Sequence, residues 1–477
     1  PEPEHMPLPG SIREVMEARL ERLGLAGKEV AKRGALMGRR FTMDAVGRIW
    51  DRPKPEMNNG MRVLQETETI YEEASKLFAG EMEKVFRHGR LHEAALARIP
   101  KEERLRWLAG LEEWAKNKLE SFGEYWEGAG IMLVPLVARS RIEHEDHDGA
   151  SLWYEALGWL HHKNHRSVES AAAFRQSLEN ASGLRRLVLQ RMITELESYG
   201  GELERARQSA LSGLEENNDA TLPASEIPLR FNGLIDDPLA RWDQISLTEA
   251  RIALQLACAE TLSKLGLMKE AESFYSEIRS ALGPLSGQSA DILQIRWANQ
   301  WGYFLTELRG DPTAAKETFD ELRRNINLSA TGLQSQHAAI ISSEFNIEMR
   351  LGHYDHAHLL AEESLKLAQA SRNIRAEARA WNSIGITLIS LGDWQGSAES
   401  YERALALART IGERRLEVIA LHNLGLTRMD QALYAEAREC QESYLSISRA
   451  TGNHMAESYA PSTLATIAMS QGDFDQA

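Results

Sequence analysis

The stretch WNSIGITLISLGDWQGSAESYERALALA, residues 381–408, decides the fold class. Its first half places Trp381, Ile384, Leu388 and Leu391 at the spacing of one helix face. Gly392 follows, and glycine adopts the left-handed backbone conformation that ends a helix at little cost. An alanine-rich second helix then begins, so the stretch predicts two antiparallel helices joined by a tight turn.

The turn of this hairpin recurs every 40 residues, in LGHYDHA (351–357), LGDWQGS (391–397), QALYAEA (431–437) and QGDFDQA (471–477). Each copy has an aromatic residue followed three positions later by a small one. We expect the aromatic residue, such as Trp394, to be buried as a wedge between hairpins, and the small residue to let two helices approach closely. Looser copies, RGDPTAA (309–315) and LGLMKEA (265–271), lie upstream.

These residues carry a resemblance to a known family. WNSIG, LGDW and AESYERAL resemble the tetratricopeptide repeat, a helical hairpin whose usual period is about 34 residues. The longer period resembles the variant with longer helices in bacterial signalling proteins. The resemblance implies an all-α fold, an α-α superhelix of about eight hairpins. It places the repeat array at 250–477, cut at its C-terminal end, and divergent helical repeats at 116–249, with an irregular insertion at 216–247.

Residues 1–115 differ from the repeats. Their apolar periodicity predicts helices over 11–23, 27–41, 42–50 and 61–78, and one short extended piece over 82–86. This part of the chain is similar to the region after the nucleotide-binding module of STAND-type signalling ATPases, which include bacterial transcription activators of the maltose-regulator type. The similarity rests on PGSI with MEARLERL, then ALMGRRF and VFRHGRLHEAALARIPKEERLRWL. This resemblance implies a small winged-helix-like domain whose last helix begins with a Phe-x-His motif, at Phe86 and His88.

Composition and charge limit the class of protein. The chain has 477 residues and a formal net charge of −15, so several domains or a repeat array are expected, and neither nucleic acid nor a membrane is an expected partner. Two cysteines, Cys258 and Cys440, allow no disulfide framework, which favours a reducing, cytoplasmic location. The sequence shows no apolar run long enough to span a membrane and no signal peptide, and both ends read as cut from a longer protein.

Motif searches find no catalytic signature. The phosphate-binding pattern GxxxxGK[ST] is absent, and GLAGKEV (24–30) lacks both its spacing and its hydroxyl residue. Neither a GxSxG nucleophile elbow nor an HExxH zinc motif occurs. We therefore expect no enzyme activity and no cofactor in this chain. The STAND resemblance implies ATP and Mg²⁺ only in an upstream domain.

Histidines are the candidates for a metal site. His88 and His92 lie four apart in FRHGRLHEAALARIP (86–100), but no other ligand is near them, so this segment is interpreted as the end of the winged-helix-like domain. Two further segments, IEHEDHDGA (142–150) and LHHKNH (160–165), hold His144, His147, His161, His162 and His165. Pairs three or four apart share a helix face, as zinc ligands require, so a site could assemble if the two segments face each other. The alternative is that these histidines cap helices and face solvent.

The concave side of the array is the expected binding surface, because the first helix of each hairpin lines it. The register set by each glycine predicts a groove of polar and aromatic residues, namely Trp297, Gln300, Phe304, Ser342, Asn346, Arg350, Arg379, Asn382, His422 and Met429. Arg350, Arg379 and Asn382 would clamp a carboxylate or a backbone. The alternative for each residue is packing between repeats.

Three functional hypotheses remain open. The leading one is a non-catalytic sensor and scaffold segment of a STAND-type ATPase. It would bind a protein, a peptide or a small-molecule trigger and relay the binding signal to an intramolecular ATPase domain. The second is a free-standing repeat adaptor that assembles protein partners. The third is a metal-dependent enzyme centred on the histidines of 144–165. A phosphate-binding loop ahead of Pro1 would discriminate between the first two.

Overall fold

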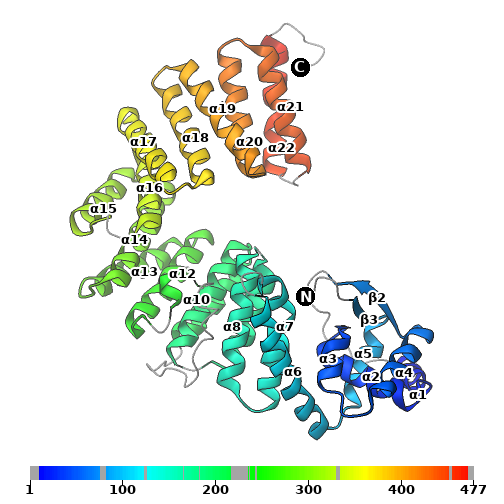
Figure 1. Ribbon diagram of the computed structural model, residues 1–477. Helices are drawn as coiled ribbons and strands as arrows, with labels where there is room; N and C mark the ends of the chain where they lie inside the picture. The colour runs from blue at the N-terminus through cyan, green and yellow to red at the C-terminus, as the bar shows by residue number, and fades with distance from the viewer. Residues whose placement is uncertain are drawn as a thin grey trace. The chain divides into compact units, whose positions relative to one another are not determined.

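A computed structural model (Figure 1) describes residues 10–75, 82–122, 126–164, 166–181, 183–215, 235, 237–241, 244–328, 333–450 and 454–470. The chain divides into two compact units, Pro1–Phe274 and Tyr275–Ala477. This division lies inside helix α13 (Met268–Leu282). The domain limits predicted at 115 and 249 instead fall inside α6 (Lys101–Ser121) and α12 (Leu247–Lys264).

The first unit begins with a module of helices and strands. Its three strands form one antiparallel sheet in the order β1-β3-β2. The helices α1, α2, α4 and α5 pack on one another. In chain order the elements are α1 (Gly10–Glu21), α2 (Gly24–Met37), β1 (Arg40–Phe41), α3 (Met43–Arg48), α4 (Lys54–Glu66), β2 (Ile70–Ala74), β3 (Met82–Phe86) and α5 (Gly89–Ala97).

The sheet is larger than the sequence predicts. Strand β3 confirms the extended piece at 82–86, but the helix predicted over 61–78 ends at Glu66 and the chain continues into β2. The segment around β2 is rich in glutamate, a helix former, so local propensity misleads there. Pairing of β2 with β3 along its whole length and burial of Ile70 outweigh that propensity. The helix predicted over 27–41 likewise ends at Met37, because Arg40 and Phe41 pair with β3.

Helix α6 fixes this module to the helices that follow. The guanidinium of Arg33, which is 1% exposed, lies 4.8 Å from the ring centroid of Trp50 and 3.9 Å from that of Trp107 on α6. Arg33 also donates to Glu29 and Asp51, each at 2.6 Å. A buried cation that is both paired and stacked on aromatic rings offsets its desolvation cost. The module and α6 therefore share one core.

The remaining helices of the first unit pack as successive neighbours, α6 on α7, α7 on α8, and α8 on α9. Part of the insertion predicted at 216–247, namely 216–234, 236 and 242–243, lies outside the described residues. Its described remainder contains a short 3₁₀ helix and the first residue of α12. The elements are α7 (Trp126–Glu143), α8 (His147–Lys163), α9 (Ser167–Glu179), α10 (Leu184–Tyr199), α11 (Leu203–Glu215), η3 (Pro238–Ala240), α12 and α13.

The second unit is an array of helical hairpins, visible in Figure 1 as antiparallel helices that follow one another from α16 to α22. From α17 to α21 every helix has 17 residues and every loop between them has three, which accounts for the 40-residue period. The helices are α14 (Gln288–Tyr303), the π-helix η4 (Phe304–Arg309), α15 (Pro312–Asn325), α16 (Gln334–Leu351), α17 (Tyr354–Ala370), α18 (Ile374–Ser390), α19 (Trp394–Thr410), α20 (Arg414–Asp430), α21 (Tyr434–Ala450) and α22 (His454–Ser470).

Glycine ends the first helices as predicted. Gly310, Gly352 and Gly392 have φ of 69°, 76° and 86°, in the left-handed region. The equivalent residue of the next hairpin is Ala432, which adopts φ of 59° although it carries a side chain. No helix in the described part of the chain is both long and apolar enough to cross a membrane.

The aromatic wedge lies at another position than predicted. Trp394 is 40% exposed and Tyr354 is 37% exposed, and each is the first residue of a second helix. The buried aromatic is Tyr401, which is 1% exposed and packs so closely on Gly385 that a Cβ there would lie 2.6 Å from its ring. The small residues Ala357, Ser397 and Ala437 are fully buried, as expected for close helix approach.

Candidate partner-binding groove

The exposed sides of the first helices form the candidate surface. Helix α14 contacts α16, and α18 contacts α20, in addition to the contacts within each hairpin. On α16 the exposed residues recur at three and four positions and therefore share one face. We call this face and its neighbours on η4, α14 and α18 the first-helix strip, formed by Tyr303, Glu307, Ala339, Ser342, Asn346, Arg350 and Arg379.

A hollow of about 430 Å³ opens on this strip between α16, α17 and α18. Phe345 and Leu360, both nearly buried, give it an apolar base, and the hydroxyls of Ser342 and Ser383 lie among its lining residues. Arg379 also lines it and is exposed. The structure thus brings together Ser342 and Arg379, two of the residues that the sequence predicts for the groove.

Arg379 gives this hollow its binding chemistry. No hydrogen bond or ion pair joins its side chain to any other described residue. A guanidinium presents five N–H donors in a fixed plane and binds carboxylates in a bidentate manner. Arg350, by contrast, already pairs with Glu307 on η4, so its charge is neutralised within the protein. The hollow therefore offers one free cation above an apolar base.

A second, smaller hollow of about 80 Å³ lies on the other side of α16, between α16 and the residues where α14 continues into η4. Its lining includes Tyr303, Thr306, Glu307, Ser343 and Asn346. Asn346 was predicted from the sequence, whereas Tyr303, Thr306 and Glu307 were not. Tyr303 is 61% exposed, and Thr306 is buried at 4% exposure.

The sequence register is wrong for α14 and η4, where Trp297 and Phe304 are buried. Trp297 donates from its indole to the backbone oxygen of Tyr275 at 2.9 Å, and Phe304 stacks on Trp301 at a centroid distance of 5.2 Å. Both therefore pack inside the unit and do not line a groove.

A one-residue insertion explains the error. Gly302 packs on Phe319 as Gly385 packs on Tyr401, so the two glycines are equivalent. Gly302 lies eight positions before its helix-ending glycine, whereas Gly385 lies seven positions before Gly392. One extra residue turns a helix face by about 100° and is accommodated here as a π-helix. The sequence register placed Phe304 in the groove, six positions before Gly310. With the extra residue, the equivalent position lies seven before Gly310, at Tyr303, which is exposed.

The other predicted groove residues are half-buried and partly engaged. Asn382 accepts a hydrogen bond at 3.0 Å from the amide of Asn423 on α20, which joins the two first helices. The ring of His422 lies 4.9 Å from that of Tyr444, and burial lowers the pKa of His422. Gln300 and Met429 are also half-buried. A binding role for these residues stays a prediction.

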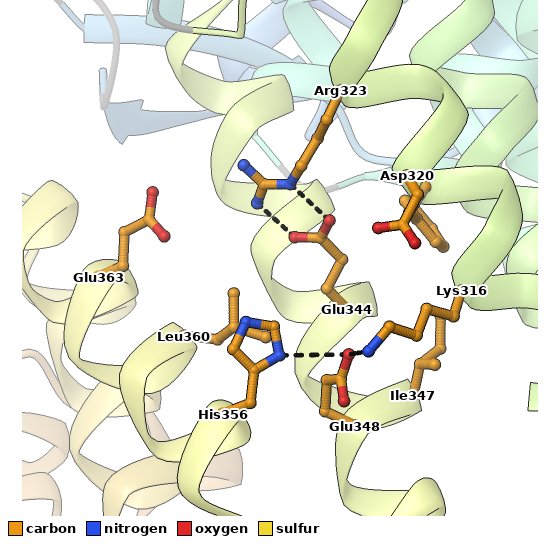
Figure 2. Close-up of a pocket in the computed structure, with 10 residues that line it drawn as sticks. Lys316, Asp320, Arg323, Glu344, Ile347, Glu348, His356, Leu360 and Glu363 are labelled. Atoms are coloured by element: carbon orange, nitrogen blue, oxygen red, sulfur yellow. Dashed lines mark hydrogen bonds and ion pairs between the residues drawn. The ribbon is translucent and has the colours of Figure 1, made fainter. Parts of the chain in front are cut away.

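A polar hollow of about 320 Å³ lies between α15, α16 and α17 (Figure 2). The Glu348 carboxylate, 3% exposed, lies 2.6 Å from the Lys316 ammonium, 2.7 Å from Nδ1 of His353 and 3.2 Å from Nδ1 of His356. Burial on its own would raise the pKa of Glu348, but the hydrogen bonds from Lys316 and His353 outweigh it and lower the pKa. Arg323 likewise pairs with Glu344, as Figure 2 shows. Because these charges satisfy one another, this hollow is an internal ion-pair cluster.

Among the described residues, the structure does not bring the histidine pairs together as a metal site. His144 and His147 lie near the start of α8, and His161 and His162 lie in its last turn, about 20 Å away at 1.5 Å per residue. His144 bonds the Ser140 backbone at 2.7 Å. His165 lies outside the described residues. Within the described part of the chain, no group of three His, Cys, Asp or Glu side chains is arranged to hold a metal ion.

The remaining candidates for chemistry are His88, His92 and Cys258. His88 is exposed and makes no side-chain cap at the start of α5, whereas His92 lies 2.9 Å from the Ala35 backbone oxygen on α2. Of the two, His92 is therefore the structural residue. Cys258 is fully buried, and burial raises the pKa of its thiol to about 11, so it is protonated at neutral pH.

The family model of the tetratricopeptide repeat matches residues 376–450, which span α18 to α21. These residues form tetratricopeptide repeats. The hairpins α18–α19 and α20–α21 of the second unit are therefore members of a repeat family defined by helical pairs. A search of curated proteins gave no match.

Among solved structures, the chain resembles a Signal Transduction ATPase with Numerous Domains (STAND) protein with a tetratricopeptide repeat sensor from Pyrococcus horikoshii, at a TM-score of 0.50 and 13% identity. The alignment covers 98% of this chain but 63% of that protein, so this chain spans less than two thirds of its length. At this identity the likeness concerns the fold. BtubC from P. vanneervenii matches at a TM-score of 0.42 and 21% identity, over 52% of this chain and 92% of that one. The apo form of RapI matches at 0.45 and 12%, over 68% and 94%.

Proposed function

We propose that the second unit binds an extended segment of a partner protein along the first-helix strip, with an acidic group of the partner at Arg379. The observation that supports this most is the exposed guanidinium of Arg379, which has no partner among the described residues and lies in a hollow whose base is apolar. An apolar base with a few polar groups is the usual construction of a binding site. In this proposal the second unit binds its partner and has no catalytic role.

The test uses a displayed library of random 12-residue peptides, selected on the full chain and measured by calorimetry. Wild type should enrich peptides with an acidic residue, and Arg379→Glu should weaken their affinity by at least about tenfold, since it replaces an attractive charge pair by a repulsive one. Lys366→Glu is the matched control, because Lys366 is an exposed cation on the second helix α17. Equal loss of affinity in both variants would show a nonspecific charge effect and remove the proposed groove.

We also propose that the chain is the sensor segment of a larger STAND-type ATPase, with the N-terminal module as a winged-helix-like relay. The order α2-β1-α3-α4-β2-β3 with its three-stranded antiparallel sheet supports this, as does the core that the module shares with α6. Peptide bound in the groove would change the packing at the ATPase through this relay. The rival function is a free-standing adaptor that only assembles partners.

The natural gene distinguishes the two. The STAND proposal requires a phosphate-binding loop ahead of Pro1 and a rate of ATP hydrolysis by the intact product that changes when a library-derived peptide is added. An intact product without that loop is an adaptor, and the groove proposal is unaffected by that result.

A further inference from the structure

The hollow beside Arg379 exists because most of the side chains that line it are small. Eight of its twelve lining residues are alanine or serine. The array itself shows what one of these positions holds in the next hairpin. Ala376 is the third residue of α18 and Leu416 is the third residue of α20, and both helices have 17 residues, so the two positions are equivalent. The hollow therefore lacks a branched aliphatic group that the array has one hairpin later.

Two serines of the hollow occupy positions that form a bridge between first helices in the next hairpin. Asn423 donates to Asn382 at 3.0 Å, which joins α20 to α18. Forty residues earlier the same positions are Ser383 on α18 and Ser342 on α16, and both line the hollow. Neither hydroxyl makes a hydrogen bond to another described residue. The hollow thus lacks the amide group of the bridge as well as the aliphatic side chain.

One residue of an extended peptide supplies both missing groups. A backbone amide offers one donor and one acceptor, and a serine hydroxyl can donate and accept, so one amide can bond to Ser342 and Ser383 at once. A leucine side chain is the group that Leu416 provides one hairpin later, and Phe345 and Leu360 form an apolar base for it. The volume of about 430 Å³ lies in the usual range of binding pockets.

We propose that this hollow is the subsite for a leucine of the partner segment, with the backbone amide of that leucine between Ser342 and Ser383. The inference rests on the proposed function, because Arg379 lines the same hollow. It names the second specificity position of the partner, a leucine close in sequence to the acidic residue that meets Arg379. The partner would complete the repeat pattern at the point where the chain itself leaves it incomplete.

The decisive variant is Ala376→Leu, which places in the hollow the side chain that the next hairpin has at the same position. Because Leu416 is accommodated there, we expect an unchanged or raised melting temperature. Leucine-containing library peptides should bind at least about tenfold more weakly, since their side chain loses its buried position. Ala406→Leu is the matched control, because Ala406 is exposed on the second helix α19, and it should leave peptide affinity intact.

A second variant tests the amide bridge. Ser342→Ala with Ser383→Ala removes both hydroxyls and breaks no hydrogen bond between described residues, so the melting temperature should not fall. Affinity for the same peptides should decrease by about five- to tenfold. Ser400→Ala is the control, because its hydroxyl donates to the Gly396 backbone oxygen at 2.7 Å on a second helix. If the double variant binds the peptides as tightly as wild type, the bridge is refuted.

Two probes separate this inference from the proposed function. In the library peptides, replacing leucine by alanine should cost wild type about tenfold and cost Ala376→Leu little. The second probe is N-acetylleucine amide alone, followed by saturation-transfer NMR against N-acetylglycine amide. Binding of N-acetylleucine amide that Ala376→Leu removes, without any library binder, supports the subsite and refutes the peptide groove. Library binders that depend on Arg379 but bind Ala376→Leu as tightly as wild type refute the subsite and support the groove, and binding of neither probe refutes both.

Discussion

The sharpest stability prediction concerns Ala432, which occupies the left-handed turn position that glycine holds in the preceding hairpins. An L-residue in this conformation costs about 1–2 kcal/mol, whereas glycine costs about 0.4–1 kcal/mol more conformational entropy on folding. Ala432 is exposed, so replacing it by glycine loses no packing. We therefore expect Ala432→Gly to raise the free energy of unfolding by about 0.5–1 kcal/mol. The same Ala→Gly change at Ala406, an exposed position inside α19, should lower it by about 1 kcal/mol.

The assay is urea unfolding followed by circular dichroism, with hydrogen exchange of the amides of α20 and α21 to localise the effect. In melting temperature the two variants should differ by about 4 °C or more for a unit of this size. Slower exchange near the α20–α21 turn in Ala432→Gly, and faster exchange in Ala406→Gly, is the expected pattern. If both substitutions lower stability equally, the positive φ of Ala432 carries no strain and the reasoning fails.

Two further predictions concern the second unit. Tyr401→Ala should lower the free energy of unfolding by about 4 kcal/mol, because it opens a cavity. Trp394→Ala should lower it by only about 2 kcal/mol, because water already reaches the indole. Equal losses of stability in urea unfolding would contradict this difference in burial. The pKa of Glu348 is lower in the folded protein than in the unfolded chain, so the ionised carboxylate stabilises the fold at pH values above the unfolded pKa. This contribution is lost as the pH falls through the folded pKa, so melting temperatures should drop between about pH 5 and 3. Glu348→Gln should flatten part of that drop, whereas Glu317→Gln, an exposed control on α15, should not.

The repeats could be predicted from the sequence because each one satisfies its own local rules. Gly392 marks the turn, apolar spacing marks both helices, and the period follows from 17-residue helices joined by three-residue loops. In a repeat array neighbouring hairpins provide most of the contacts, so local pattern and tertiary packing agree. The N-terminal module is different, because β2 depends on pairing with β3, whereas the glutamates in and before β2 on their own favour a helix.

Exposure at the turn was harder to predict than the turn itself. Trp394 and Tyr401 both belong to the repeat pattern, and both are aromatic. Their burial depends on what lies opposite, and Gly385, which admits the ring of Tyr401, is the feature that distinguishes them. A glycine inside a helix is a signal for close approach of a large side chain, and it was available in the sequence.

One inserted residue at the end of α14 explains why the predicted groove register is wrong there, and it also makes this segment functionally interesting. Counting back from Gly310 assumes that each first helix has the same length from glycine to glycine, and one inserted residue breaks that assumption at η4. The insertion rotates Tyr303 onto the strip. A sequence selected only for regular stacking would gain nothing from this irregular turn, because the π-helix is less favourable than the regular helix of the later hairpins. A partner group that packs on the exposed ring of Tyr303 would offset that cost, which is why the position where the repeat pattern fails is a candidate for specificity.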